Sequence, residues 1–144
     1  MINIGISGAS GRMGQTLVTV IKKNREFNLS LALEKKGHKD IGKMIGDIKI
    51  VDDLTEGIDK IDVFIDFTLP EATLENLEIL KEYNKPVVIG TTGFNNKELK
   101  IIEENSKKIP IVLSYNFSVG VNVLWKIVKD LTKILKDDYD IDII

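Results

Sequence analysis

Residues 4–14 read Ile-Gly-Ile-Ser-Gly-Ala-Ser-Gly-Arg-Met-Gly, and this stretch decides how the chain folds. A β-branched run leads into Gly8, Gly11 and Gly14, and apolar residues at helical spacing follow. We predict a strand, a tight turn and a helix in that order. Glycines let a backbone approach a pyrophosphate closely, and the first turn of a helix offers N–H groups with a partial positive charge. The stretch therefore predicts a turn that binds a dinucleotide.

An acidic residue in the expected place supports this prediction. Residues 30–34, Ser-Leu-Ala-Leu-Glu, read as a short buried strand that ends in Glu34. Glu34 follows Gly8 by 26 positions, near the roughly 20 expected for the acid that binds the ribose of a dinucleotide. The alternative is a parallel-sheet domain in which the glycines serve only turns and close packing.

The composition is that of an ordinary globular domain. Of the 144 residues, 43% are hydrophobic and 29% are charged, and the net charge is −2. This charge offers no broad basic surface for nucleic acid, and no apolar run is long enough for a membrane span. The chain has no cysteine, which excludes disulfides, cysteine-bound zinc and thiol nucleophiles. We expect a cytoplasmic protein without a metal site and without a nucleic-acid or membrane partner.

Short apolar runs alternate with segments of helical periodicity along the chain. Strands are predicted over residues 2–7, 30–34, 48–51, 62–67, 86–90 and 110–113, and helices over residues 12–23, 69–83, 96–106 and 119–136. This alternation predicts an α/β fold with a doubly wound parallel sheet, a Rossmann-like dinucleotide-binding domain. The loops that follow the strands then share one edge of the sheet, where ligands bind. The candidate cofactor-binding residues are Gly8, Ala9, Ser10, Gly11, Arg12, Met13, Glu34, Lys35, Phe67, Gly90, Thr91, Thr92, Ser114, Tyr115, Asn116 and Phe117.

Local patterns also predict how the later helices begin and pack. Residues 68–71, Thr-Leu-Pro-Glu, read as a capping box with proline in the first turn, and Asn95 with Glu98 marks the start of the next helix. Trp125 is expected to pack against the protein, and residues 139–144 alternate like a strand. The apolar side of the last helix is expected to be buried through Val121, Leu124, Val128, Leu131 and Leu135.

The loop after Glu34 is rich in lysine. Lys35, with Lys36, is placed to attract the 2′-phosphate of NADP, and the alternative is a solvated loop. Glu34 accepts hydrogen bonds from a free ribose hydroxyl and repels a phosphate unless lysines offset its charge, so either NADH or NADPH is a candidate cofactor. The one histidine, His38, reads as an exposed imidazole with no partner and no catalytic or metal role.

Two further loops carry groups suited to a nicotinamide ring. Residues 90–93, Gly-Thr-Thr-Gly, would present hydroxyl and N–H groups to the carboxamide or to a substrate carboxylate, and the alternative is a simple turn into a helix. Residues 115–118, Tyr-Asn-Phe-Ser, offer an aromatic face and an amide. The alternative there is that Ser118 caps the last helix and Phe117 belongs to the core.

Four motifs in matching order resemble the 4-hydroxy-tetrahydrodipicolinate reductase family, also called dihydrodipicolinate reductase. They are Gly-Arg-Met-Gly at 11–14, Phe-Ile-Asp-Phe-Thr at 64–68, Ile-Gly-Thr-Thr-Gly-Phe at 89–94 and Asn-Phe-Ser-Val-Gly-Val-Asn at 116–122. The resemblance covers the whole chain. It implies an oxidoreductase that uses NADH or NADPH to reduce a small molecule, 4-hydroxy-tetrahydrodipicolinate, in lysine and diaminopimelate biosynthesis.

The resemblance also assigns roles to residues. Residues 8–13 would hold the pyrophosphate and ribose, Glu34 the adenosine ribose, and Lys35 an NADP phosphate. Gly90, Thr91 and Thr92 would line the nicotinamide side, with Thr92 near the substrate. Residues 114–117 would complete the cofactor pocket.

One departure from the family pattern limits what this chain is expected to do. In the family, a strand like residues 139–144 leads into a histidine-rich segment with a lysine and then into a substrate domain through which a tetramer assembles. We therefore expect residues 1–138 to be the dinucleotide-binding domain and 139–144 the start of a connection, with no catalytic residue in this chain. Alone, it is expected to be inactive and a monomer or weak oligomer. The rival hypotheses are another two-domain dehydrogenase, of the aspartate or homoserine type, and a non-catalytic module that senses NADH.

Overall fold

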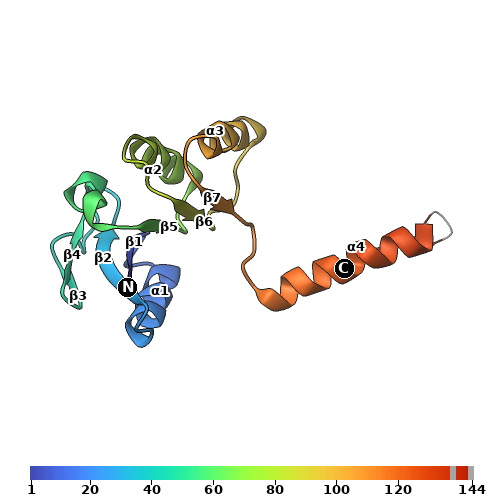
Figure 1. The fold of residues 1–144 in the computed structure, drawn as a ribbon, viewed down its shortest axis with the longest axis horizontal. Helices are drawn as coiled ribbons and strands as arrows, with labels where there is room; N and C mark the ends of the chain where they lie inside the picture. The colour runs from blue at the N-terminus through green and yellow to red at the C-terminus, as the bar shows by residue number, and fades with distance from the viewer. Residues whose placement is uncertain (137–138, 143–144) are drawn as a thin grey trace. The chain divides into compact units, whose positions relative to one another are not determined.

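The computed structural model describes residues 1–136 and 139–142, and its centre is a seven-stranded sheet in the order β3-β4-β2-β1-β5-β6-β7 (Figure 1). The strands are β1 Ile2–Ser7, β2 Phe27–Leu33, β3 Met44–Ile45, β4 Ile48–Val51, β5 Val63–Asp66, β6 Val87–Ile89 and β7 Ile111–Leu113. The helices are α1 Arg12–Lys23, α2 Pro70–Glu82, α3 Asn96–Ser106 and α4 Val119–Leu135, with short 3-10 turns η1 Leu54–Glu56 and η2 Ile58–Lys60. All neighbouring strands are parallel except β3, which is antiparallel to β4. The predicted α/β fold with a doubly wound sheet is confirmed, and β3 is an antiparallel addition that the sequence analysis does not predict.

The chain divides into two units. Met1–Ser114 forms one compact unit that contains the whole sheet with α1, α2 and α3, and Tyr115–Ile144 forms a second that contains α4. Within the parts that the structure describes, no helix combines the length and apolar character needed to cross a bilayer.

Helices cover both faces of the sheet, as Figure 1 shows, with α1 on one face and α2 and α3 on the other. On the first face Val18 and Ile21 of α1 pack into a buried cluster with Ile6. On the second face Leu77 of α2 joins a cluster with Phe64 of β5. Each such side chain, when fully buried, contributes about 1.5–3 kcal/mol to folding. Strands covered on both faces must be apolar on both sides, which explains the nearly continuous apolar runs in the sequence.

The parallel strands end in register. Ser7 at the end of β1 pairs with Leu33 of β2 and with Asp66 of β5. Asp66 in turn pairs with Ile89 of β6, and Ile89 with Leu113 of β7. The loops that follow these strands therefore leave the sheet along a single edge.

The direction of winding reverses at β1, because β2 lies on one side of it and β5 on the other. Ligands bind at such a switch point in open α/β sheets. Two loops meet there: Gly8 has φ +68°, and a Cβ on it would lie 3.0 Å from Cγ2 of Thr68. Glycine is required at this position because other residues rarely adopt that backbone conformation.

The predicted starts of α2 and α3 have different outcomes. The capping box at α3 is confirmed, because the Asn95 side chain accepts hydrogen bonds from Lys97 N and Glu98 N while Glu98 accepts one from Asn95 N. The capping box at α2 is wrong. Its N-cap is Leu69, and Pro70 does lie in the first turn, but the Thr68 hydroxyl donates instead to Asp66 Oδ1 at 2.5 Å. Because the N-cap is Leu69, Thr68 lies one residue before the position from which a capping side chain accepts from the second or third helical amide.

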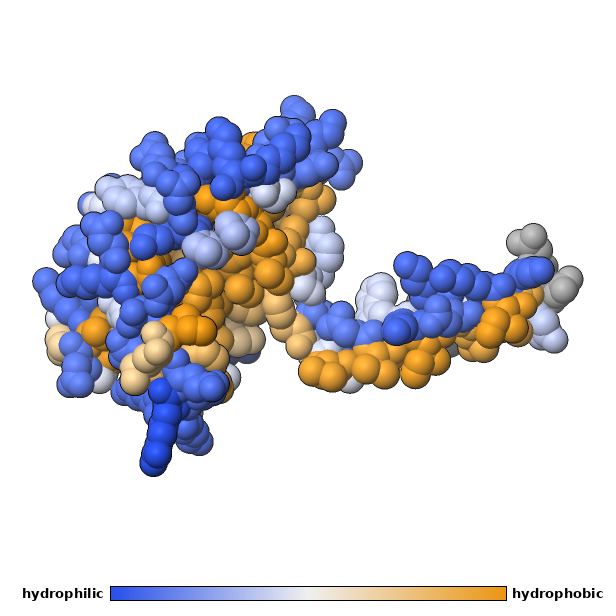
Figure 2. Space-filling model, viewed as in Figure 1, coloured by the Kyte–Doolittle hydropathy of each residue, from blue (hydrophilic) through white to orange (hydrophobic). Residues whose placement is uncertain are grey.

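The prediction that α4 buries its apolar side is wrong for the part of the chain that is described. None of the α4 residues is buried, and Leu124 and Leu131 are exposed. Trp125 is likewise exposed, which contradicts its predicted packing. In Figure 2 the apolar side chains form a continuous band along one side of this helix. The periodicity therefore indicates an amphipathic helix, but it does not specify what covers the apolar side. Residues 139–142 do not form a strand, and residues 143–144 lie outside the described residues.

We predict that Gly14→Ala destabilises the fold strongly, because α1 lies directly against the turn at this residue. A Cβ on Gly14 would lie 2.2 Å from Gly8 O and 2.7 Å from Ala9 Cα, and these backbone atoms cannot move aside cheaply. Overpacking of this kind costs about 3 kcal/mol. The matched control is Gly37→Ala, where φ is +75° but no atom lies within 4 Å, and where the cost is about 1 kcal/mol. Urea unfolding of both variants tests this, and equal losses would contradict it.

Candidate functional site

The amides of the glycine turn are largely used by the protein itself. Gly8 N and Ala9 N both donate to Leu33 O, at 3.0 and 3.2 Å, and Gly11 N donates to Gly8 O at 3.0 Å. Ser10 N donates to Glu34 Oε1 at 2.8 Å. These four donors already have acceptors, so of the predicted residues 8–13 those at the start of α1 are the ones whose amides could receive a pyrophosphate.

The donors that remain lie one step further along, at the start of α1. The hydrogen bond from Gln15 N to Gly11 O, at 2.9 Å, is the first of the helix, so the amides of Arg12, Met13 and Gly14 precede it. Gly11, the N-cap, supplies no side-chain acceptor for them. The first amides of a helix have no partner within it and carry partial positive charge. Arg12 and Met13 are exposed, so this turn presents N–H groups to an anion.

Glu34 lies where the sequence predicts, directly after β2 and against the glycine turn. It is 8% exposed, and its bond to Ser10 N uses one carboxylate oxygen. The second oxygen makes no hydrogen bond within the described residues. The Ser10 hydroxyl is buried and also has no partner among them. The site thus holds a carboxylate oxygen and a hydroxyl that can both bind a polyhydroxylated ligand.

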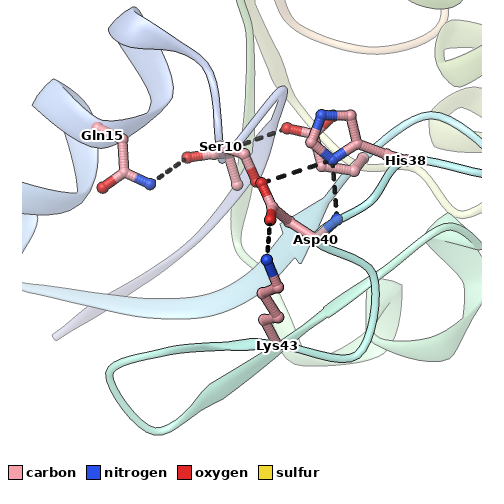
Figure 3. Close-up of polar contacts among 7 residues, drawn as sticks. Ser10, Gln15, His38, Asp40 and Lys43 are labelled. Atoms are coloured by element: carbon pink, nitrogen blue, oxygen red, sulfur yellow. Dashed lines mark hydrogen bonds and ion pairs between the residues drawn. The ribbon is translucent and has the colours of Figure 1, made fainter.

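The loop after Glu34 is held by its own side chains, and Figure 3 shows His38, Asp40 and Lys43 together with Ser10 of the glycine turn and Gln15 of α1. Lys43 Nζ donates to Asp40 Oδ1 at 2.5 Å, and this hydrogen bond lowers the pKa of Asp40. His38 Nδ1 accepts from Asp40 N at 3.3 Å. His38 is thus half-buried and partnered, which corrects the expected exposed imidazole.

The same loop leaves Lys35 exposed, so its role toward an NADP phosphate stays a prediction. The side chains that the structure describes contain no group of three or more His, Cys, Asp and Glu that could hold a metal ion.

A buried polar network lies beneath this edge, and sequence reasoning missed it. Asp66, at the end of β5, is fully buried. Its Oδ1 accepts from the hydroxyls of Thr68 at 2.5 Å and Thr91 at 3.4 Å, and its Oδ2 accepts from Asn76 Nδ2 at 2.9 Å. Asn76 Nδ2 also donates to the Ser7 hydroxyl at 3.3 Å. The available signal was a lone aspartate at the end of an otherwise apolar strand, with threonines in the two loops that follow β5 and β6.

The two threonines of residues 90–93 point in different directions. Thr91 is 2% exposed, and its Oγ1 accepts from Thr68 N at 2.9 Å and from Thr73 Oγ1 at 2.8 Å. The expectation that Thr91 presents its hydroxyl to a ligand is therefore corrected. Thr92 is exposed, and the loop offers a ligand the Thr92 hydroxyl and the backbone of Gly90.

Phe67 lies against Gly90. A Cβ on Gly90 would lie 2.0 Å from Cε1 of the Phe67 ring, so only glycine allows the ring to cover this backbone. Ser114 belongs to the same edge, since its N–H donates to Ile89 O at 3.1 Å.

The remaining predicted residues, Tyr115, Asn116 and Phe117, belong to the second unit. There Asn116 Oδ1 accepts from Ser118 N at 2.8 Å, and Ser118 Oγ caps α4 by accepting from Val121 N at 3.4 Å. The helix-cap alternative for Ser118 is confirmed. Phe117 is 43% exposed, so its core alternative is wrong.

Burial raises the pKa of Asp66 above the ordinary value of 3.8, although its hydroxyl and amide donors act in the opposite direction. The folded chain therefore binds this proton more tightly than the unfolded chain does. Its contribution to stability is complete below the unfolded pKa and is lost as the pH rises through the raised value.

We predict that Asp66→Asn, which cannot ionise, becomes more stable relative to the natural chain as the pH rises from about 4 to about 7. Urea unfolding across this range measures the difference. Asp53→Asn is the matched control. The pKa of Asp53 is lowered by its hydrogen bonds with Thr55, so the relative stability of its variant should change mainly at and below about pH 4 and little between about pH 5 and pH 7. A difference for Asp66→Asn that does not change with pH would contradict the prediction.

Comparison with known proteins identifies the family. The family model described as "Dihydrodipicolinate reductase, N-terminus" matches residues 2–117. The chain belongs to the dihydrodipicolinate reductase family. A 4-hydroxy-tetrahydrodipicolinate reductase from Geobacter metallireducens is 43% identical over the whole of this chain, which spans 57% of that protein. The chain thus spans little more than half the length of the curated relatives that it matches.

Solved structures agree with this family. A dipicolinate-bound dihydrodipicolinate reductase from Paenisporosarcina matches 92% of this chain and 54% of its own, with a TM-score of 0.72 and 28% identity. A homoserine dehydrogenase from Staphylococcus aureus matches 78% of this chain and 32% of its own, with a TM-score of 0.60 and 19% identity. The second likeness shows a shared fold alone.

Proposed function

We propose that this chain binds NADH or NADPH along the edge where the parallel strands end. In this proposal it is the nucleotide-binding part of an enzyme that reduces 4-hydroxy-tetrahydrodipicolinate to tetrahydrodipicolinate in lysine and diaminopimelate biosynthesis. The observation that carries the proposal is the hydrogen bond between Ser10 N and Glu34 Oε1. It joins the carboxylate at the end of β2 to the glycine turn, which is the arrangement that a dinucleotide-binding fold uses for ribose and pyrophosphate.

The residues present fit the adenosine half of a dinucleotide. The Arg12 and Met13 amides would receive the pyrophosphate at the positive end of α1. The second Glu34 oxygen would accept from the ribose hydroxyls, and the buried Ser10 hydroxyl, which has no partner among the described residues, would gain one. Lys35 would offset the charge of Glu34 when the ribose carries a phosphate.

The nicotinamide half would lie at the other side of the switch point. Gly90 would contact it through its backbone, Phe67 through its ring, and Thr92 would present its hydroxyl toward the ring or the substrate. Ser114, whose N–H donates to Ile89 O on the same edge, belongs to this side of the proposed site. A cofactor role for residues 115–117 stays what the family resemblance implies. The bound nicotinamide would supply the hydride, while the protein supplies position and electrostatics.

We predict that Glu34→Gln weakens NADH binding about tenfold, because a hydrogen bond to a charged group is worth about 1.5–3 kcal/mol. Glutamine keeps an oxygen for Ser10 N, so the turn should persist. NADPH binding should fall less, because the variant loses the repulsion between carboxylate and phosphate. Calorimetric titration measures both affinities. Glu26→Gln, at an exposed position before β2, is the control that should bind as the natural chain does. Unchanged NADH affinity for Glu34→Gln would refute the assigned role.

A second experiment tests whether this chain binds NADH without catalysing the reduction. The chain alone should bind NADH but consume it no faster than buffer does when 4-hydroxy-tetrahydrodipicolinate is supplied, as followed by NADH absorbance. The full-length relative from Geobacter metallireducens serves as the positive control. Rapid consumption by the chain would show that these 144 residues already contain the catalytic groups. Binding of NADH that is coupled to capture of a partner protein, with no turnover in any full-length form, would favour a sensing module instead.

A further inference from the structure

We propose that Thr91, anchored by Asp66, is a positioning residue for the nicotinamide end of the site. It holds residues 90–93 in the conformation that binds nicotinamide, and it does so without touching the cofactor. This inference rests on the proposed function and assigns a role within it to a side chain that lies inside the protein.

The hydrogen bonds of Thr91 connect the loop after β6 to three other segments of the chain. Its Oγ1 accepts from Thr68 N in the loop after β5 and from Thr73 Oγ1 on α2. It donates to Asp66 Oδ1 on β5 at 3.4 Å. The hydroxyl therefore has two donors and one acceptor, which is its full capacity. No capacity remains for a ligand, so any effect of this side chain on binding must be indirect.

Asp66 connects the two halves of the proposed site, the glycine turn and the loop after β6. Asp66 pairs with Ser7 on one side and with Ile89 on the other. Through Asn76 its carboxyl group also reaches the Ser7 hydroxyl, one residue before the glycine turn. One buried carboxyl group thus sets the position of the residue that leads into Gly8 and, through Thr91, of the loop on the nicotinamide side.

A role in stability alone does not account for this network. Burying an acid without a cationic partner is costly, and apolar side chains of similar volume often serve stability as well or better. Hydrogen bonds add direction, which apolar contacts lack, and a fully satisfied buried network fixes one arrangement of the groups it joins.

The inward direction of the Thr91 side chain affects the neighbouring residue, Thr92. Thr91 is buried and Thr92 is exposed. Holding Thr91 inward therefore sets the outward direction of the Thr92 hydroxyl and of the Gly90 backbone, the two groups that the loop offers to nicotinamide. Sites of this kind need support from side chains that do not touch the ligand.

The test compares NADH with ADP-ribose, which has the same adenosine and pyrophosphate but lacks nicotinamide. Thr91→Val keeps the branched shape and removes the hydroxyl, leaving Thr68 N and the Thr73 hydroxyl without their acceptor. We expect it to bind NADH about tenfold more weakly and ADP-ribose within about twofold of the natural chain. Thr91→Ser retains the hydroxyl and should restore NADH binding to within about threefold. Calorimetric titration of each variant with both ligands measures these ratios.

Two further variants complete the design. Thr73 is 1% exposed, and Thr73→Val removes the hydroxyl that donates to Thr91 Oγ1. We expect it to lower the affinity for NADH relative to that for ADP-ribose, as Thr91→Val does. It therefore tests the inference even where Thr91→Val does not fold. Asn105→Ala is the matched control. Its side chain is buried on α3 and donates to Ile101 O at 2.9 Å and to Glu78 Oε1 of α2 at 3.4 Å, neither of which belongs to the network. It should lower the unfolding midpoint and leave the ratio unchanged.

The outcomes separate this inference from the proposed function. A natural chain that binds neither ligand would overturn the proposed function and this inference with it. A natural chain that binds both equally well would overturn only the inference, since the nicotinamide end would then add no affinity. The inference would also fail if Thr91→Val and Thr73→Val weakened both ligands equally or weakened neither.

Discussion

The in-register ends of the parallel strands are the constraint from which the candidate site follows. Because Ser7, Asp66 and Ile89 are lateral neighbours, the glycine turn and the loops after β5 and β6 have to leave the sheet side by side. The reversal of strand order at β1 then opens the space between the first two of these loops. The glycines allow the close approaches that result, with Gly8 beside Thr68 and Gly90 beneath the Phe67 ring.

The hydrogen-bonding groups at this edge divide into those that shape the site and those that remain available to a ligand. The amides of Gly8, Ala9, Ser10 and Gly11 are used to shape the turn, so the anion-binding capacity moves to the first turn of α1. Glu34 takes part in both functions in our proposal, because one oxygen holds Ser10 N and the other would bind a ribose. On the nicotinamide side the same division separates Thr91, which faces inward, from Thr92, which faces outward.

Sequence patterns predicted well where the physical cause is local. The capping box of Asn95 and Glu98 depends on atoms within one helical turn, and the strand cores depend on short apolar runs. The same reasoning failed at Thr68, because the N-cap of α2 is Leu69, one residue later, and the Thr68 hydroxyl donates to Asp66. It also began β2 at residue 30, whereas the strand starts at Phe27. For α4 the periodicity correctly indicated an amphipathic helix, but an apolar stripe does not say what covers it.

By itself, the sequence determined the alternation of strands and helices, the glycine turn, the acid at the end of β2 and, through four motifs, the family. These features are encoded in neighbouring residues, so propensity and spacing suffice to find them. Only the tertiary structure decided which donors are free, which threonine faces inward and that Asp66 joins the loops. The partners in those contacts lie far apart in the chain, 24 residues for Ser10 and Glu34 and 23 for Thr68 and Thr91. A hydrogen bond over such a separation exists only once packing has brought the strands together.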